Sequence, residues 1–144
     1  MVVPVFRSFY LAGFECATGY NMHGEWIDQI AATEHDLHAD ADYERLADVG
    51  IRAVREAIRW PLVDRGGRYD FSSAEPFVDA ALRHRFDVIW DLFHYGYPED
   101  LDPFSRAFAP SNASSIGTPD EMRSAASLSA RGSSTAWLRS SGER

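Results

Sequence analysis

The chain has 144 residues, and 45% of them are hydrophobic, which is enough for one domain with a core. Its net charge is −8, and its fourteen basic residues are all arginine. This acidic balance argues against a nucleic-acid-binding protein, because phosphates attract clustered cations. No apolar run approaches the roughly 20 residues of a membrane span, so we expect no membrane partner.

Two features of the sequence indicate its compartment. Residues 1–10 contain one arginine and lack the small-residue cleavage pattern of a secretory signal. Cys16 is the single cysteine, so no internal disulfide can form, and an unpaired thiol suits a reducing environment. We therefore expect a cytoplasmic protein.

The first element in chain order is a predicted strand followed by a long loop. Residues 9–16 are mainly aromatic and apolar and are typical of a strand. Residues 17–39 show no clean periodicity and are predicted as a loop with one helical turn at 26–31. Loops of this length in compact domains are usually functional.

A helix and a second strand come next. Asp40 or Asp42 is the predicted cap of the helix, and Gly50 is its predicted stop. Residues 51–60 are predicted as a strand whose apolar residues are interrupted by charge toward its carboxyl end.

The last predicted elements are another helix and a third strand. Ser72 or Ser73 caps this helix, and Pro76 lies in its first turn, where an amide is dispensable. Residues 86–94 have a continuous apolar centre, which is typical of a strand covered on both faces. Because helical crossovers join the three strands, we predict a parallel sheet.

Two parallel architectures can hold such a sheet. A doubly wound sheet usually carries a glycine-rich phosphate-binding turn after its first strand, and this chain has none. A barrel instead places polar residues at the carboxyl ends of several strands. Glu15, residues 55–60, Asp91 and His94 follow that pattern. We therefore predict an α/β fold of the (β/α)8, or TIM-barrel, type.

The composition changes near Pro110. Residues 111–144 contain ten serines and one aromatic residue, whereas residues 1–110 contain four serines. We predict two regions, a partial barrel at 1–109 and a disordered or out-of-frame tail at 110–144. A natural linker is the alternative, although a linker should follow a completed domain.

Two segments resemble the family 1 β-glycosidases and their wider clan of retaining barrel glycosidases. Residues 54–61 read VREAIRWP, and residues 92–98 read LFHYGYP, like the second and third strand ends of that family. Residues 20–24 match the family's first-strand motif loosely. The resemblance covers residues 10–104 and implies an incomplete TIM barrel of about three of the eight βα units, related to β-glucosidases and β-galactosidases.

The resemblance also implies a role for several side chains. Arg55 would orient the nucleophilic carboxylate, and His94 would hydrogen-bond a sugar hydroxyl. Asn21 would add a polar contact in the same pocket. Trp60 and Tyr95 would stack on a pyranose ring, although aromatic residues in strands usually belong to the core.

Retaining glycosidases need two carboxylates about 5–5.5 Å apart. The resemblance puts these groups on the fourth and seventh strands, and the recognisable sequence stops after the third. The only carboxylate side chains of the tail are those of Asp120, Glu121 and Glu143. We therefore expect no catalytic residues and no cofactor in this chain, and a β-linked saccharide as its ancestral substrate.

Several polar residues have two interpretations. His35 and His38 have the spacing of a metal pair on one helix face, but with no third ligand evident we expect surface histidines and no metal. Cys16 is expected to be a small buried apolar residue.

The strand-end charges are similarly open. Glu15 and Asp91 are either carboxylates of the barrel mouth or partners of Arg55 or Arg59. Glu56 and Arg59 can pair within or across strands.

Three functional hypotheses remain. The first is an inactive fragment of a glycosidase. The second is a non-catalytic sugar-binding or interaction remnant, for which open sheet edges predict self-association. The third is another barrel enzyme, such as a sugar isomerase or a metal-dependent hydrolase.

Overall fold

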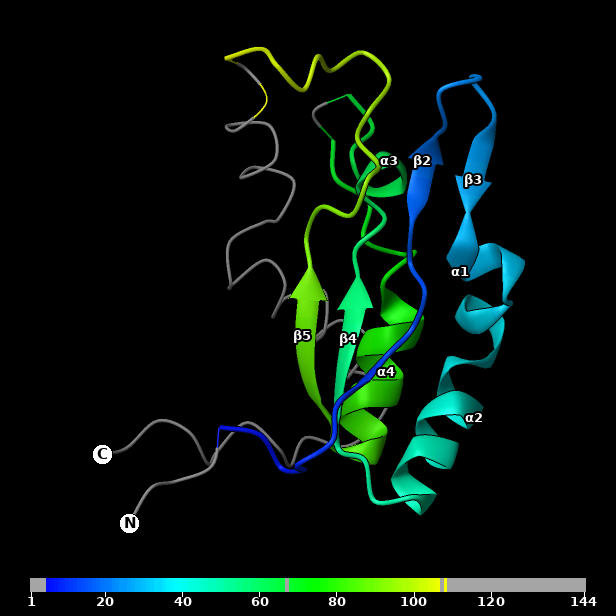
Figure 1. Cartoon of the computed structure of the whole chain (residues 1–144), viewed down its shortest axis with the longest axis vertical. Coiled ribbons are helices and arrows are strands. Elements are labelled where there is room, and N and C mark those ends of the chain that lie inside the picture. Colours follow the sequence, from blue (N-terminus) through cyan, green and yellow to red (C-terminus); the bar gives the residue numbers. More distant parts are fainter. Residues whose placement is uncertain (1–4, 67, 107, 109–144) are drawn as a thin grey trace.

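A computed structural model describes residues 5–66, 68–106 and 108 (Figure 1). The predicted tail at 110–144 therefore lies outside the described residues. The elements in chain order are β1 Ala12–Gly13, β2 Thr18–Tyr20, β3 Trp26–Asp28, α1 Gln29–Ala32, α2 His35–Asp48, β4 Ala53–Ala57, α3 Trp60–Val63, α4 Glu75–His84 and β5 Asp87–Asp91. Within these described ranges, no helix has the length and apolar character needed to cross a membrane.

The main sheet has three strands in the order β1-β4-β5, and both pairings are parallel. Ala12 pairs with Val54, and Val54 pairs with Val88, so the three strands are aligned side by side. The predicted parallel sheet is confirmed, with neighbours in chain order. The sheet does not close into a barrel within the described part of the chain.

The strand β1 is much shorter than the predicted strand 9–16, and the predicted loop 17–39 is largely structured. It contains the antiparallel pair of β2 and β3, the short α1 and the beginning of α2. The two strands of this hairpin are too short to leave a clear alternating pattern in the sequence.

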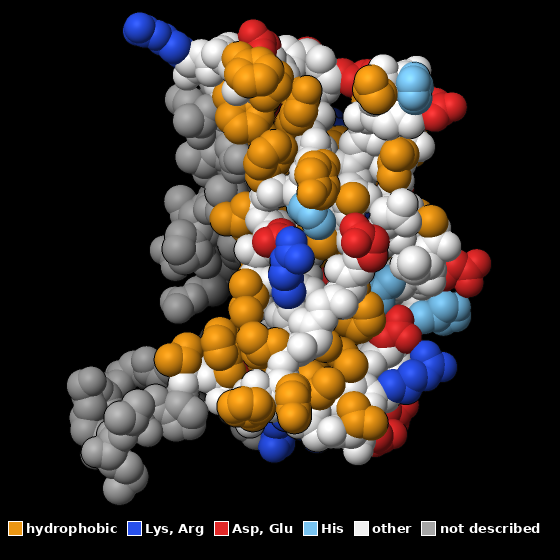
Figure 2. Space-filling view, viewed as in Figure 1, with side chains coloured by type: hydrophobic (Ala, Val, Ile, Leu, Met, Phe, Trp, Pro, Cys, Tyr) orange, Lys and Arg blue, Asp and Glu red, His pale blue; other side chains and the backbone are white. Residues whose placement is uncertain are grey.

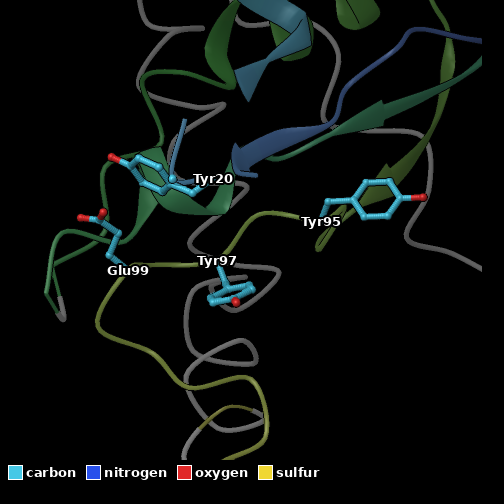
Figure 3. Close-up of a pocket in the computed structure, with 5 residues that line it drawn as sticks. Tyr20, Tyr95, Tyr97 and Glu99 are labelled. Carbon is cyan, nitrogen blue, oxygen red and sulfur yellow. The ribbon is translucent and has the colours of Figure 1, made fainter. Parts of the chain in front are cut away.

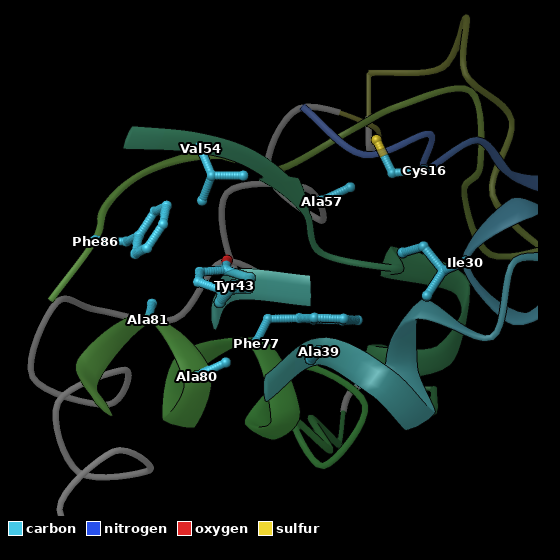
Figure 4. Close-up of a cluster of buried hydrophobic side chains, with 10 residues drawn as sticks. All are labelled: Cys16, Ile30, Ala39, Tyr43, Val54, Ala57, Phe77, Ala80, Ala81 and Phe86. Atoms are coloured by element: carbon cyan, nitrogen blue, oxygen red, sulfur yellow. The ribbon is translucent and has the colours of Figure 1, made fainter. Parts of the chain in front are cut away.

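The helices α2 and α4 pack against each other and against one face of the main sheet (Figure 1). Figure 4 shows that α2 and α4 send apolar side chains toward β4. The core cluster consists of Cys16, Ile30, Ala39, Tyr43, Val54, Ala57, Phe77, Ala80, Ala81 and Phe86. Since successive strand residues point to opposite faces, Arg55, which lies between Val54 and Glu56, faces the side without helices.

The helix α2 begins at His35, which corrects the prediction that Asp40 or Asp42 caps it. Glu34 precedes it in a left-handed conformation (φ 58°) and makes no side-chain cap, so the usual sequence signal is missing. Gly50 ends the helix as predicted, with φ 81°. The amides of Gly50 and Ile51 bond back to the last turn, which is the Schellman arrangement.

The helix α4 begins after Ala74, so neither Ser72 nor Ser73 is its cap. Pro76 lies in the first turn, as predicted. The last turn holds Arg83 and His84, whose side chains suit the negative end of the helix dipole.

A buried polar network joins α2 to β4. The carboxylate of Glu56 is 0% exposed, and its Oε1 atom accepts hydrogen bonds from His35 Nε2 (3.0 Å) and Tyr43 Oη (2.9 Å). The other ring nitrogen of His35 lies 2.8 Å from Asp42 Oδ2. His35 is 2% exposed, so the prediction that it is a surface histidine is wrong, whereas His38 is exposed.

The charge state of His35 follows from this geometry. Burial alone would lower the pKa of His35, but the hydrogen bonds to Glu56 and Asp42 outweigh burial and raise the pKa above the ordinary 6.5. An imidazolium can donate from both nitrogens, and each nitrogen faces a carboxylate. The ring also stacks on Phe14 and Phe77, which keep water away from the pair.

Arg59 forms a second buried junction and does not pair with Glu56. Its Nη1 atom lies 3.1 Å from both Asp28 Oδ2 and Asp36 Oδ2. Asp28 caps α1, and Asp36 is in the first turn of α2. Arg59 therefore ties the ends of two helices to the segment after β4.

We expect the stability of the protein to fall as the pH rises above 6.5 and through the raised pKa of His35. A histidine whose pKa is higher in the folded state contributes stability below its ordinary pKa, and this contribution is lost as the folded form gives up its proton. Thermal unfolding over this pH range measures the effect. His38→Gln, at an exposed position of the same helix, should keep the slope. The slope should flatten in His35→Gln, and an unchanged slope there would contradict the assignment.

Candidate functional site

Five polar side chains gather around the carboxyl ends of β1 and β5, where the guanidinium of Arg55 reaches them from the middle of β4. We call Glu15, Cys16, Arg55, Asp91 and His94 the strand-end cluster. Figure 2 shows charged and histidine side chains gathered on the helix-free side of the sheet, with hydrophobic side chains around them. Gly13 lies opposite Arg55 in the register of β1 and β4.

The central pair of the cluster joins β4 to β5. The guanidinium of Arg55 is in direct contact with Asp91 Oδ2, and the arginine side chain is 48% exposed. Hydrogen bonding to Asp91 and its charge raise the pKa of Arg55. Of the two alternatives for Asp91, pairing with Arg55 is the one that the structure shows. Glu15 instead accepts hydrogen bonds from the backbone amides of Cys16 and Ala17, each at 3.1 Å.

Cys16 and His94 form the inner part of the cluster. The Sγ atom of Cys16 lies 3.0 Å from His94 Nδ1, and Nδ1 lies 3.9 Å from Asp91 Oδ2. Burial raises the pKa of Cys16 to about 11, and the positive charge of Arg55 opposes this rise. The expected burial of Cys16 is confirmed. Its contact with His94 was not expected, because 78 positions separate the two residues.

An aromatic pocket adjoins the cluster. Tyr20, Gly24, Tyr95, Tyr97 and Glu99 line a hollow of about 230 Å³, which we call the tyrosine pocket. Tyr20 comes from β2, and the other three side chains come from the segment after β5 (Figure 3). The rings of His94 and Tyr95 have centroids 4.5 Å apart, which connects the pocket to the strand-end cluster.

A close backbone contact holds the pocket loop in place. A Cβ atom on Gly96 would lie 1.6 Å from the carbonyl oxygen of Thr18, so the loop can cross β2 at this distance only with glycine. Tyr95, next to it, has φ 68°, an uncommon conformation for a residue with a side chain. The contact explains why glycine separates the two tyrosines of the loop.

The structure brings together three of the five side chains predicted for a sugar site. Arg55 and His94 both approach Asp91, and Tyr95 lines the adjoining pocket. Asn21 lies in the turn between β2 and β3, where its side chain bonds the Glu25 carboxylate and nearby amides. Asn21 therefore stabilises the turn between β2 and β3.

Trp60 lies in the core and does not line the pocket. It is 1% exposed, and its ring makes edge contacts with Phe93 and Phe108. The stacking role implied by the resemblance therefore disagrees with its position. The aromatic side chains that do line the pocket with Tyr95 are Tyr20 and Tyr97, which lie in segments that carried no periodic signal.

Comparison with known proteins adds no relationship. No protein-family model, no curated protein and no solved structure matches this chain. The strand-end cluster and the tyrosine pocket are therefore the features that indicate a function.

We expect Gly96→Ala to displace the loop that carries Tyr95 and Tyr97. The added methyl group would overlap the Thr18 carbonyl, and forcing such a group into a packed site typically costs about 1–3 kcal/mol. Urea denaturation measures the loss. Gly13→Ala is the matched control, since its nearest neighbour would be the Arg55 Cβ at 3.7 Å, an ordinary contact. Equal stability of the two variants would contradict the close crossing.

Proposed function

We propose that this chain is a saccharide-binding βα unit, related to the first part of a retaining (β/α)8 glycosidase and without a catalytic pair of its own. The observation that supports it best is the convergence of Arg55, from the middle of β4, with Asp91 and His94 at the carboxyl end of the neighbouring parallel strand β5. Barrel enzymes place their ligand sites at this end of the sheet.

The side chains of the tyrosine pocket and of the strand-end cluster suit a sugar ligand. Three tyrosines offer flat apolar faces, and Glu99 adds a hydrogen-bond acceptor in the same hollow. His94, whose ring lies against Tyr95, and Arg55, in the adjoining strand-end cluster, can donate to hydroxyl oxygens. The preference for a β-linked sugar rests on the resemblance of segments 54–61 and 92–98 to family 1 β-glycosidases.

The two carboxylates of the cluster are poorly suited to glycosidic catalysis. Asp91 is paired with Arg55, and Glu15 accepts two backbone amides. A retaining mechanism requires a nucleophile and a protonated acid facing each other across the bond, and the resemblance puts both on later strands than β1, β4 and β5. We therefore propose binding without hydrolysis.

The helix-free face supports a second candidate function, association with another chain. Ile89 of β5 and Phe93 just after it remain partly exposed, as does Leu11 before β1. Apolar surface beside unpaired strand edges favours self-association. We place the protein in the cytoplasm, because Cys16 is a free thiol.

The direct test is a titration with methyl β-glucoside and methyl β-galactoside, followed by calorimetry and by nuclear magnetic resonance. We expect dissociation constants in the millimolar range, corresponding to about −4 kcal/mol. Tyr95→Ala should weaken binding about fivefold, since an aromatic contact is worth roughly 1 kcal/mol. Aryl β-glucosides should not be hydrolysed.

Tyr10→Ala is the control for this titration. Tyr10 is 72% exposed, close to the 76% of Tyr95, but it lies before the amino end of β1. An equal loss of affinity in the two variants, or no binding of either sugar, would contradict the proposal. Sedimentation at the same concentrations reports whether the binding species is a monomer or an assembly.

A further inference from the structure

Three different ligand types converge within the strand-end cluster. Cys16 Sγ, His94 Nδ1 and an Asp91 carboxylate oxygen all lie within 4.8 Å of one another. Cys16 lies in the segment after β1, Asp91 is the last residue of β5, and His94 follows β5 closely. The two edge strands of the β1-β4-β5 sheet therefore lead into all three ligands, with β4 between them.

We propose that Cys16, Asp91 and His94 bind a divalent transition-metal ion, with Zn²⁺ as the best fit. Thiolate, imidazole and carboxylate are the three ligand types that Zn²⁺ takes in proteins. Three protein ligands leave one tetrahedral position for water, as in catalytic zinc sites. Mg²⁺ and Ca²⁺ are disfavoured, because they prefer oxygen ligands throughout.

The surrounding charges fit a divalent cation. Asp91 and Glu15 are acidic, and the Cys16 thiolate would add a third negative charge against the single cation of Arg55. Binding replaces the thiol proton, which leaves for the solvent as the sulfur–metal bond forms. Arg55, in contact with Asp91, would act as the outer partner that holds the carboxylate toward the ion.

The position of the site gives it a consequence for ligand binding. The His94 ring lies against Tyr95, so an ion held by His94 would lie beside the tyrosine pocket. The water on its fourth position could be exchanged for a hydroxyl group of a bound ligand. The metal proposal itself stands on the three ligands and does not require saccharide binding.

Co²⁺ alone is the probe for this site, added to the purified chain without sugar. Because Cys16 is the single cysteine, a thiolate-to-cobalt charge-transfer band can arise from no other residue of the chain. We expect this band in the near ultraviolet, saturating at one ion per chain, together with the visible bands of tetrahedral cobalt. Zn²⁺ should then displace Co²⁺ and abolish both. Absence of the charge-transfer band in the unaltered protein would overturn the proposal, whatever the variants do.

Variants then identify the other two ligands. His94→Gln and Asp91→Asn should each weaken Co²⁺ binding by more than about tenfold, the loss that follows removal of even an outer partner. Circular dichroism checks that both are folded. His23→Gln, an exposed histidine in the turn between β2 and β3, should bind Co²⁺ like the unaltered chain. Unchanged affinity in both ligand variants would mean that Cys16 binds cobalt without them, and the three-ligand site would be rejected.

Discussion

The buried carboxylate of Glu56 is the group on which the arrangement of this structure depends. It has no contact with solvent, so its charge must be matched inside the protein. His35 and Tyr43, both on α2, donate to the same oxygen, and removing one partner of such a buried pair typically costs about 3–5 kcal/mol. These hydrogen bonds therefore hold α2 against β4 in one register, and α4 packs against both elements.

Two neighbouring residues of β4 have different roles, one in stability and one in the candidate site. Glu56 points to the helices and anchors α2, whereas Arg55, one position earlier, points to the helix-free face and contacts Asp91. The alternation of the strand therefore couples the two sides. Any shift of β4 by one residue would expose the buried carboxylate and dismantle the strand-end cluster at the same time.

The sequence predicted the elements with strong local signals. The third strand, the stop at Gly50 and the first turn of α4 at Pro76 follow from apolar runs and from helix-end residues. The start of α2 could not be predicted, because Glu34 makes no side-chain cap. The burial of His35 depends on a carboxylate 21 positions away, which no local pattern reveals.

The candidate site divides in the same way. Short sequence motifs predicted Arg55 and His94 as site residues. The contact of His94 with Cys16 and the crossing of Gly96 over Thr18 depend on tertiary structure, so no motif could predict them. Trp60 shows the opposite case, since a motif implied a binding role and packing buries the ring. Residue type indicated the chemistry available, while the fold decided which groups meet.

The most direct test of this account is a double-mutant cycle between His35 and Glu56, with stability measured by urea denaturation of His35→Gln, Glu56→Gln and the double variant. If the buried pair holds α2 on β4, the coupling energy should be about 1–3 kcal/mol, as for residues in one hydrogen-bond network. Losses that simply add, within about 0.5 kcal/mol, would show that the pair does not hold the helix and would contradict the account.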